Sequence, residues 1–267
     1  MSRNFALLRI IGKEEEYFQG GGETPAPGLA AVPPPPITNS SLSSESVERQ
    51  RIVQPLHDLQ PLCFEMEAWQ REELNKLVYG IFLAPGAEAN RTIVLASAES
   101  GNGCSWICAR AAELLASQVA GRVCLVDANF ASPTLHDHFG VPNHYGLSES
   151  LRQEESIGSY VSQLSRQNLA LVSAGSDFSS ASQEQKFPLE RLCLRLQQLR
   201  AQFDYVLLDG ESLDLGDASI ALAGMADGLV IVLNTDSTRK ARTRRRVQDL
   251  KSAGVRILGS VLNQPAC

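Results

Sequence analysis

The sequence lacks the features that would place the chain in a membrane or outside the cell. No stretch approaches the ~18 to 20 consecutive apolar residues of a membrane-spanning helix. The segment Met1–Lys13 has neither the apolar core nor the small-residue cleavage site of a signal peptide. The six cysteines form no CxxC pair, and no histidine stands at the spacing of a zinc ligand. We therefore expect free thiols and a cytoplasmic protein.

Positive charge is also too scarce for a protein that mainly coats nucleic acid or anionic lipid. Lysine and arginine number 24 against 30 aspartates and glutamates, which gives a net charge of −6. We therefore expect nucleic acid not to be a partner. The 267 residues, 43% hydrophobic and 20% charged, are typical of a globular protein of one or two domains with a sizeable core.

The first quarter of the chain differs in composition from the rest. Apolar positions within Asn4–Phe18 predict one short amphipathic helix, so residues 1–19 form the first predicted segment. Residues 20–64 contain three consecutive glycines, four consecutive prolines and many serines, which predict a disordered or extended linker. Residues 65–267 form the predicted main domain, which opens with an amphipathic stretch over Glu65–Leu83.

Short aliphatic runs alternate with helical patterns through the main domain. The runs are Thr92–Ala96, Val123–Val126, Leu169–Val172, Tyr205–Leu208, Leu229–Leu233 and Ile257–Leu262. Near-continuous apolar strands separated by helices predict an α/β fold with a parallel sheet flanked by helices on both faces. Ligands of such sheets bind beyond the carboxyl ends of the strands, so a site is expected in the loops there.

The first of these strands leads directly into a glycine-containing loop and a helix. The candidate phosphate-binding residues are Gly101, Asn102, Gly103, Cys104, Ser105 and Trp106. Backbone N–H groups and the positive end of the helix would point at an anion, which predicts a phosphate cradle. The Walker A sequence G-x-x-x-x-G-K-[ST] is not matched, because Ala98 and Cys104 replace its first glycine and its lysine.

The cysteine at the lysine position has a chemical consequence. The lysine of a phosphate loop neutralises charge that grows on the transferred phosphoryl group, and losing such a cation costs on the order of 10³-fold or more in rate. We therefore expect binding to survive better than transfer. A thiol at a helix N-terminus is also expected to have a lowered pKa, so Cys104 is either a reactive thiol or an inert loop thiol. The alternative for the loop is an ordinary tight turn.

Two carboxylates follow two later aliphatic strands. Asp127 comes after Val123–Val126, and Asp209 comes after Tyr205–Leu208. Both would face the loop across the edge of the sheet. Asp209 suits a water-mediated ligand of Mg²⁺, Ser105 suits a direct ligand, and Asp127 suits a catalytic base or second metal contact. The alternative role of an aspartate at a strand end is to cap a helix.

Together these motifs resemble the bacterial tyrosine kinase domains of capsule and exopolysaccharide systems, within the MinD/ParA-like group of P-loop ATPases. The likeness covers about Glu65–Asn263. It rests on the phosphate loop, on Asp127–His136 as the Walker A′ motif and on Asp204–Asp209 as the Walker B motif. The resemblance implies a P-loop NTPase fold with ATP or ADP and Mg²⁺ as ligands.

By this resemblance Ser105, Asp127 and Asp209 handle Mg²⁺, and Asp127 is also the residual catalytic base. Asn263 falls in a loop that contacts the nucleotide base. The chain departs from the family pattern elsewhere. Asn129 replaces the second aspartate and Ala131 the arginine of the A′ motif, in addition to the cysteine in the phosphate loop.

Two further departures concern the Walker B motif and the C-terminus. Glu211 and Ser212 replace the prolines that usually follow the Walker B aspartate. The family's autophosphorylated tyrosine cluster at the C-terminus is absent, because no tyrosine follows Tyr205. The resemblance with these losses predicts a degenerate kinase-like protein with weak or no phosphoryl transfer.

We expect such a protein to act as a regulatory or scaffolding component of exopolysaccharide or capsule biosynthesis and export. Its partners would be a membrane polysaccharide co-polymerase or export protein, and copies of itself or of an active kinase. It would be cytoplasmic, held at the inner membrane through that partner. One alternative is an active tyrosine kinase that uses a substitute cation. The other is a MinD/ParA-like positioning ATPase that grips membrane or DNA through the basic stretch Arg239–Arg246.

Overall fold

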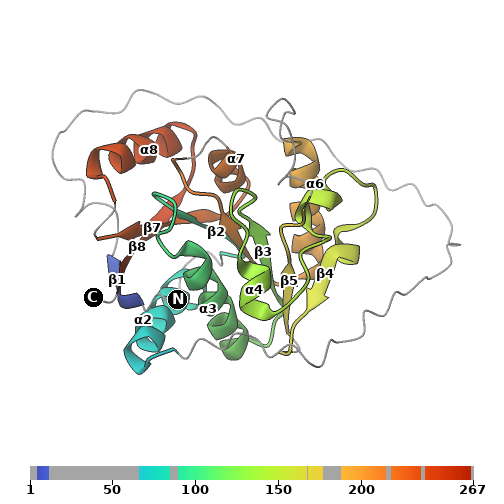
Figure 1. Ribbon diagram of the computed structural model, residues 1–267, viewed down its shortest axis with the longest axis horizontal. Coiled ribbons are helices and arrows are strands. Elements are labelled where there is room, and N and C mark those ends of the chain that lie inside the picture. The colour runs from blue at the N-terminus through green and yellow to red at the C-terminus, as the bar shows by residue number, and fades with distance from the viewer. Residues whose placement is uncertain are drawn as a thin grey trace, which may run out of the picture.

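A mostly parallel sheet of eight strands runs through the computed structural model, with helices on both of its faces (Figure 1). The structure describes residues 66–84, 90–166, 168–176, 188–214, 218–235 and 238–265, and the backbone of residues 5–11. The strands are β1 (Phe5–Ile11), β2 (Thr92–Ser97), β3 (Val123–Ala128), β4 (Val161–Gln163), β5 (Leu169–Val172), β6 (Tyr205–Gly210), β7 (Gly228–Asn234) and β8 (Ile257–Pro265). The helices are α2 (Ala68–Val78), α3 (Cys104–Gln118), α4 (Leu135–Phe139), α5 (Leu147–Ser150), α6 (Leu189–Gln202), α7 (Ala218–Gly224) and α8 (Lys240–Ser252).

The strands lie in the order β1-β8-β7-β2-β6-β3-β5-β4. The six inner strands are parallel, while β1 and β4 run antiparallel at the two edges. The predicted parallel sheet with helices on both faces is confirmed. This order sets β6 between β2 and β3. The loops that follow these three strands therefore meet at the carboxyl ends of the parallel strands.

The N-terminal segment forms a strand where the sequence predicted a helix. The helix predicted over Asn4–Phe18 is wrong for Phe5–Ile11, which pair with β8 and place Ile11 opposite Ser260. The run includes two isoleucines, whose branched side chains favour strands, and β8 supplies main-chain hydrogen-bond partners. The rest of the predicted helix and the linker predicted over 20–64 lie outside the described residues.

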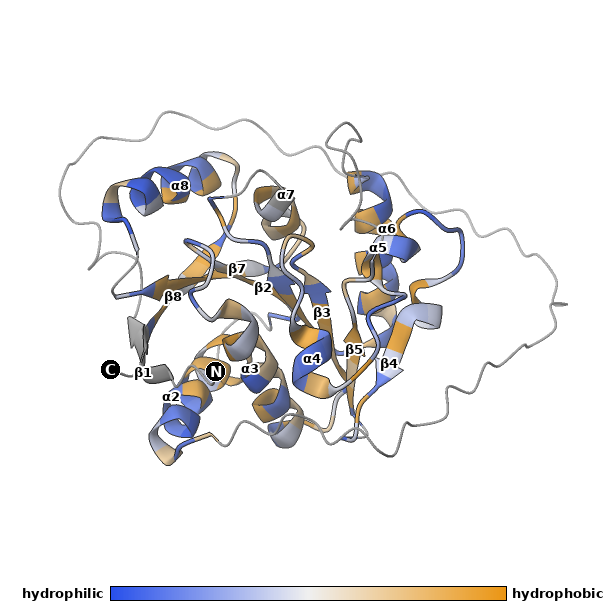
Figure 2. Cartoon of the chain, in the orientation of Figure 1, coloured by the Kyte–Doolittle hydropathy of each residue, from blue (hydrophilic) through white to orange (hydrophobic). Residues whose placement is uncertain are grey.

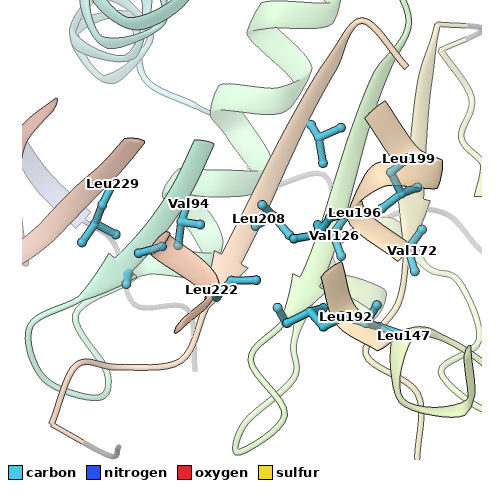
Figure 3. Packing of buried hydrophobic residues seen from close by; sticks show 14 of the residues in the cluster. Val94, Val126, Leu147, Val172, Leu192, Leu196, Leu199, Leu208, Leu222 and Leu229 are labelled. Carbon is cyan, nitrogen blue, oxygen red and sulfur yellow. The ribbon is translucent and has the colours of Figure 1, made fainter. Parts of the chain in front are cut away.

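The core consists of two apolar layers, one on each face of the sheet. Along β2, Ile93 and Leu95 pack toward α2 and α3, while Val94 and Ala96 pack toward α6, α7 and α8. Figure 3 shows the second layer, where leucines of α6 and α7 meet alternate residues of the strands. Because successive strand residues point to opposite faces, a sheet covered twice needs apolar residues at nearly every position. Figure 2 shows this as apolar strands between helices with hydrophilic outer faces.

Candidate functional site

The phosphate loop, residues 98–103, joins the end of β2 to the start of α3. Gly101 and Gly103 adopt φ angles of 83° and 80°, a left-handed conformation that glycine reaches without strain. Gly103 is also the N-cap of α3, so the free N–H groups of the first helical turn open onto the loop. The strand, glycine loop and helix N-terminus predicted from the sequence are all present.

Neighbouring strands hold the phosphate loop in place. Asn263 of β8 is fully buried, and its Nδ2 donates a hydrogen bond of 2.8 Å to the carbonyl of Asn102. The amide of Ala98 donates to the carbonyl of Val232 in β7 at 2.8 Å. Asn263 therefore positions the loop in this structure, and its contact with a nucleotide base stays a prediction.

Cys104 begins α3 with its side chain turned inward, where only 7% is exposed. Burial, and then the negative charge of neighbouring Asp209, raise the pKa of the Cys104 thiol well above its usual range. The hypothesis of a thiol activated by the helix N-terminus is therefore wrong, because desolvation outweighs the helix dipole here. Trp106 is buried as well and packs in the core cluster on the α3 face.

The two predicted carboxylates are register partners on adjacent strands. Asp127 of β3 stands opposite Asp209 of β6, and both side chains are fully buried. Burial raises the pKa of Asp127 to about 6. Burial and then the charge of Asp127 raise the pKa of Asp209 to about 8, although the Ser105 hydroxyl and the Cys104 thiol favour its ionised form. Too little positive charge lies near the two carboxyl groups for both of them to ionise at neutral pH.

Hydrogen bonding separates the two carboxylates. Asp127 accepts backbone N–H groups from Asn129 at 3.1 Å, Thr134 at 3.2 Å and Leu135 at 3.1 Å. It therefore shapes residues 129–134, the A′ loop, and accepts the first amide of α4, although the N-cap residue of that helix is Thr134 and not Asp127. Both oxygens of Asp209, by contrast, are buried and accept no hydrogen bond of normal geometry from the described residues.

An orphaned buried carboxylate needs a ligand or a proton. Oxygen ligands are what Mg²⁺ prefers, and Asp209 with the nearby hydroxyl of Ser105 supplies two kinds of oxygen at the mouth of a phosphate loop. Among the described residues, no group of three or more His, Cys, Asp or Glu side chains is arranged to hold a metal ion. The residues therefore fit a Mg²⁺ ion whose remaining ligands are phosphate and water oxygens.

Two further glutamates connect the site, and sequence reasoning did not assign them a role. Glu211, which replaces a proline of the Walker B pattern, accepts the amide of Ala131 at 3.2 Å and so ties the end of β6 to the A′ loop. Glu99 of the phosphate loop accepts the amide of Arg239 at 3.0 Å, which fixes the start of α8 beside the loop. These contacts span 80 and 140 residues, so no local pattern could have shown them.

The basic stretch predicted on a helix lies at the start of α8, which is largely hydrophilic in Figure 2. Arg239, Lys240, Arg242 and Arg245 are exposed. Arg242 forms a loose ion pair of 3.7 Å with Asp214, in the segment that follows β6. Positive side chains therefore flank the same edge of the sheet as the phosphate loop.

Sequence comparison relates the chain to known kinases. The tyrosine-protein kinase YwqD of Bacillus subtilis is 26% identical over 180 residues, which cover 65% of this chain and 72% of YwqD. The homologues of this chain are bacterial tyrosine kinases. The succinoglycan biosynthesis transport protein ExoP of Rhizobium meliloti is 29% identical over 180 residues, 67% of the chain but only 23% of ExoP. No family model matches the chain.

Solved structures agree with this relationship. The kinase domain of the Escherichia coli tyrosine kinase ETK matches with a TM-score of 0.63 at 20% identity, over 73% of the chain and 75% of that domain. The kinase domain of VpsO matches with a TM-score of 0.61 at 24% identity, over 74% and 99%. Cobyrinic acid a,c-diamide synthase from Mycobacterium smegmatis, solved with an ATP analogue and magnesium, matches with a TM-score of 0.55 at 19% identity, over 65% and 75%. The fold is therefore that of bacterial tyrosine kinase domains and MinD/ParA-like P-loop proteins.

A membrane-spanning helix is not found in the part of the chain that the structure describes, since no helix there is both long and apolar enough.

Proposed function

We propose that this protein binds a nucleotide with Mg²⁺ but transfers its phosphoryl group weakly or not at all. In this role it is a cytoplasmic regulatory or scaffolding component of exopolysaccharide or capsule biosynthesis and export. The homology to tyrosine kinases and to a succinoglycan biosynthesis transport protein supports the pathway. The partners we propose are a membrane polysaccharide co-polymerase or export protein and further copies of this chain or of an active kinase.

The position of Cys104 is the observation that carries the proposal. This residue stands where a Walker A loop has its lysine, and its side chain is buried beside Asp209. A neutral buried thiol cannot neutralise charge on a transferred phosphoryl group, which a lysine ammonium does. The loop itself retains its two left-handed glycines and its helix N-terminus, which bind phosphate through backbone N–H groups.

Calorimetric titration with ATP in the presence and absence of Mg²⁺ tests the binding half of the proposal. We expect saturable binding that strengthens with Mg²⁺, because Asp209 and Ser105 then gain a cation. Ser105→Ala should reduce the gain from Mg²⁺, whereas Ser117→Ala, at the other end of α3, is the matched control and should not. An absence of binding under both conditions would contradict the proposal.

A MinD/ParA-like positioning role is the second candidate, and the exposed cations of α8 favour it. Arg239, Lys240, Arg242 and Arg245 face solvent next to the loop that would sense nucleotide. Co-sedimentation with anionic liposomes and with duplex DNA tests this role. ATP-dependent binding that is lost when Arg242 and Arg245 become glutamine would favour it over scaffolding.

A further inference from the structure

A hollow of about 590 Å³ opens at the amino ends of the parallel strands, on the opposite side of the sheet from the phosphate loop at their carboxyl ends. It lies where β2, β6, β7 and β8 begin and where α6 ends. The lining residues are Asn90, Arg91, Thr92, Arg200, Phe203, Asp204, Val206, Asp227 and Arg256. None of these residues belongs to the nucleotide site, because parallel strands carry that site at their other ends.

Three arginines from separate parts of the chain converge on this hollow. Arg91 precedes β2, Arg200 lies in the last turn of α6 and Arg256 precedes β8, and all three are exposed. Two carboxylates, Asp204 and Asp227, share the lining, so the hollow has one more positive than negative group. The chain as a whole carries −6, and the hollow is thus a positive site on an acidic protein.

The carboxylates of the hollow are already engaged by backbone N–H groups. Asp227 Oδ2 accepts the amides of Arg91 at 2.8 Å and Thr92 at 2.7 Å. Asp204 Oδ2 accepts the amide of Arg122 at 2.8 Å. These N–H groups already solvate the two carboxylates. The carboxylates therefore offset the positive charge of the arginines less than unengaged carboxylates would.

Contacts with neighbouring groups hold two of the three guanidinium groups, those of Arg200 and Arg91. The Nε–H group of Arg200 donates a hydrogen bond of 2.8 Å to Thr92 Oγ1, and its Nη2 donates one of 2.7 Å to the carbonyl of Met225. The same Nη2 lies 3.5 Å from Asp227 Oδ1. The guanidinium of Arg91 stacks 4.9 Å above the ring of Tyr205. Side chains ordered in this way lose little further entropy when they bind a ligand.

We propose that this hollow is a binding site for a small oxyanion with more than one phosphate or carboxylate group. Arginine forks match both groups in geometry, and three of them from different directions favour a ligand with several charged groups. The volume lies within the range of about 300–1,000 Å³ that small-molecule sites span. A lining dominated by charged and polar side chains excludes an apolar ligand.

Calorimetric titration of the full chain with pyrophosphate and with citrate tests the proposal and separates the two chemistries. Wild-type protein should bind at least one of them, and the stronger ligand identifies phosphate or carboxylate as the preferred group. The double variant Arg91→Gln, Arg256→Gln should weaken that binding about tenfold or more, since two charge-assisted contacts are lost. Arg200 stays unchanged because it anchors α6.

Two control variants keep the result specific. Arg122→Gln removes a nearby arginine that stacks 4.6 Å over Phe203 but does not line the hollow. Gly101→Asp adds a negative charge to the phosphate loop, where a new Cβ meets no atom within 4 Å; the left-handed φ of 83° strains the backbone, so the folding of this variant is verified first. Both should leave the affinity of the hollow for the anion within about twofold, and Gly101→Asp should remove only separate binding of pyrophosphate at the phosphate loop. Absence of binding, loss of binding only in Gly101→Asp, or unchanged binding in a folded double variant would overturn the proposal.

Discussion

Asp209→Asn should stabilise the protein at alkaline pH and flatten the pH dependence of its stability. The folded protein raises the pKa of Asp209 to about 8, whereas an aspartate in an unfolded chain ionises near 3.9. Between these values the folded state holds a proton that the unfolded state has released. Stability from this group is therefore greatest at acidic pH and is lost as the pH rises through about 8.

The magnitude follows from linkage. While a group is protonated only in the folded state, the free energy of unfolding falls by about 1.36 kcal/mol for each pH unit. With a folded pKa of about 8, Asp209 therefore lowers the free energy of unfolding by about 2 kcal/mol from pH 6 to pH 8. Asp127, with a pKa of about 6, acts in the same direction but mostly at lower pH. The window from pH 6 to pH 8 therefore reports chiefly on Asp209.

Urea denaturation of metal-free protein at several pH values measures this effect. Asparagine cannot ionise, so Asp209→Asn should lose most of the fall in unfolding free energy that the wild type shows from pH 6 to pH 8. Glu154→Gln, which removes an exposed carboxylate, should keep the wild-type slope. A wild-type stability that stays constant or rises over this window would refute the account of an uncompensated carboxylate pair.

Other parts of the structure give further expectations. Arg195 is buried and donates to backbone carbonyls of the α5 region, so Arg195→Met should lower unfolding free energy by about 2 to 4 kcal/mol in urea denaturation. Gly175 has a φ of 85°, and a Cβ there would lie 1.9 Å from Glu149 Oε2, so Gly175→Ala should cost about 3 kcal/mol or more and lower the thermal midpoint. Mass spectrometry after brief maleimide treatment should find Cys193, which is half-buried, labelled before the buried Cys104. Equal labelling of both thiols, or unchanged stability of either variant, would contradict these assignments.

The sequence predicts the sheet well because its signal is strong and local. Six aliphatic runs separated by helices leave little alternative to a parallel sheet covered on both faces. Parallel strands also place the residues after each strand at the same edge, so Asp127 and Asp209 were expected near the phosphate loop. That they would be direct register partners depended on strand order, which local sequence does not carry.

Three features depended on distant contacts and could not be read from local pattern. Phe5–Ile11 suits a helix or a strand, and the partner that decides it is β8, at the other end of the chain. The pKa of Cys104 depends on the inward direction of its side chain, which outweighs its place at a helix N-terminus. Asp127 and Asp209 have similar sequence settings, yet only Asp127 finds backbone N–H partners.

The rate of ATP turnover with Mg²⁺ tests the central claim most directly. We expect the wild type to show none above background, and Cys104→Lys to raise it by restoring a cation beside the phosphates. Cys193→Lys, on the half-buried surface of α6, is the matched control and should not. Turnover by the wild type that disappears in Asp127→Asn, which keeps an oxygen for the A′ loop amides, would contradict the claim.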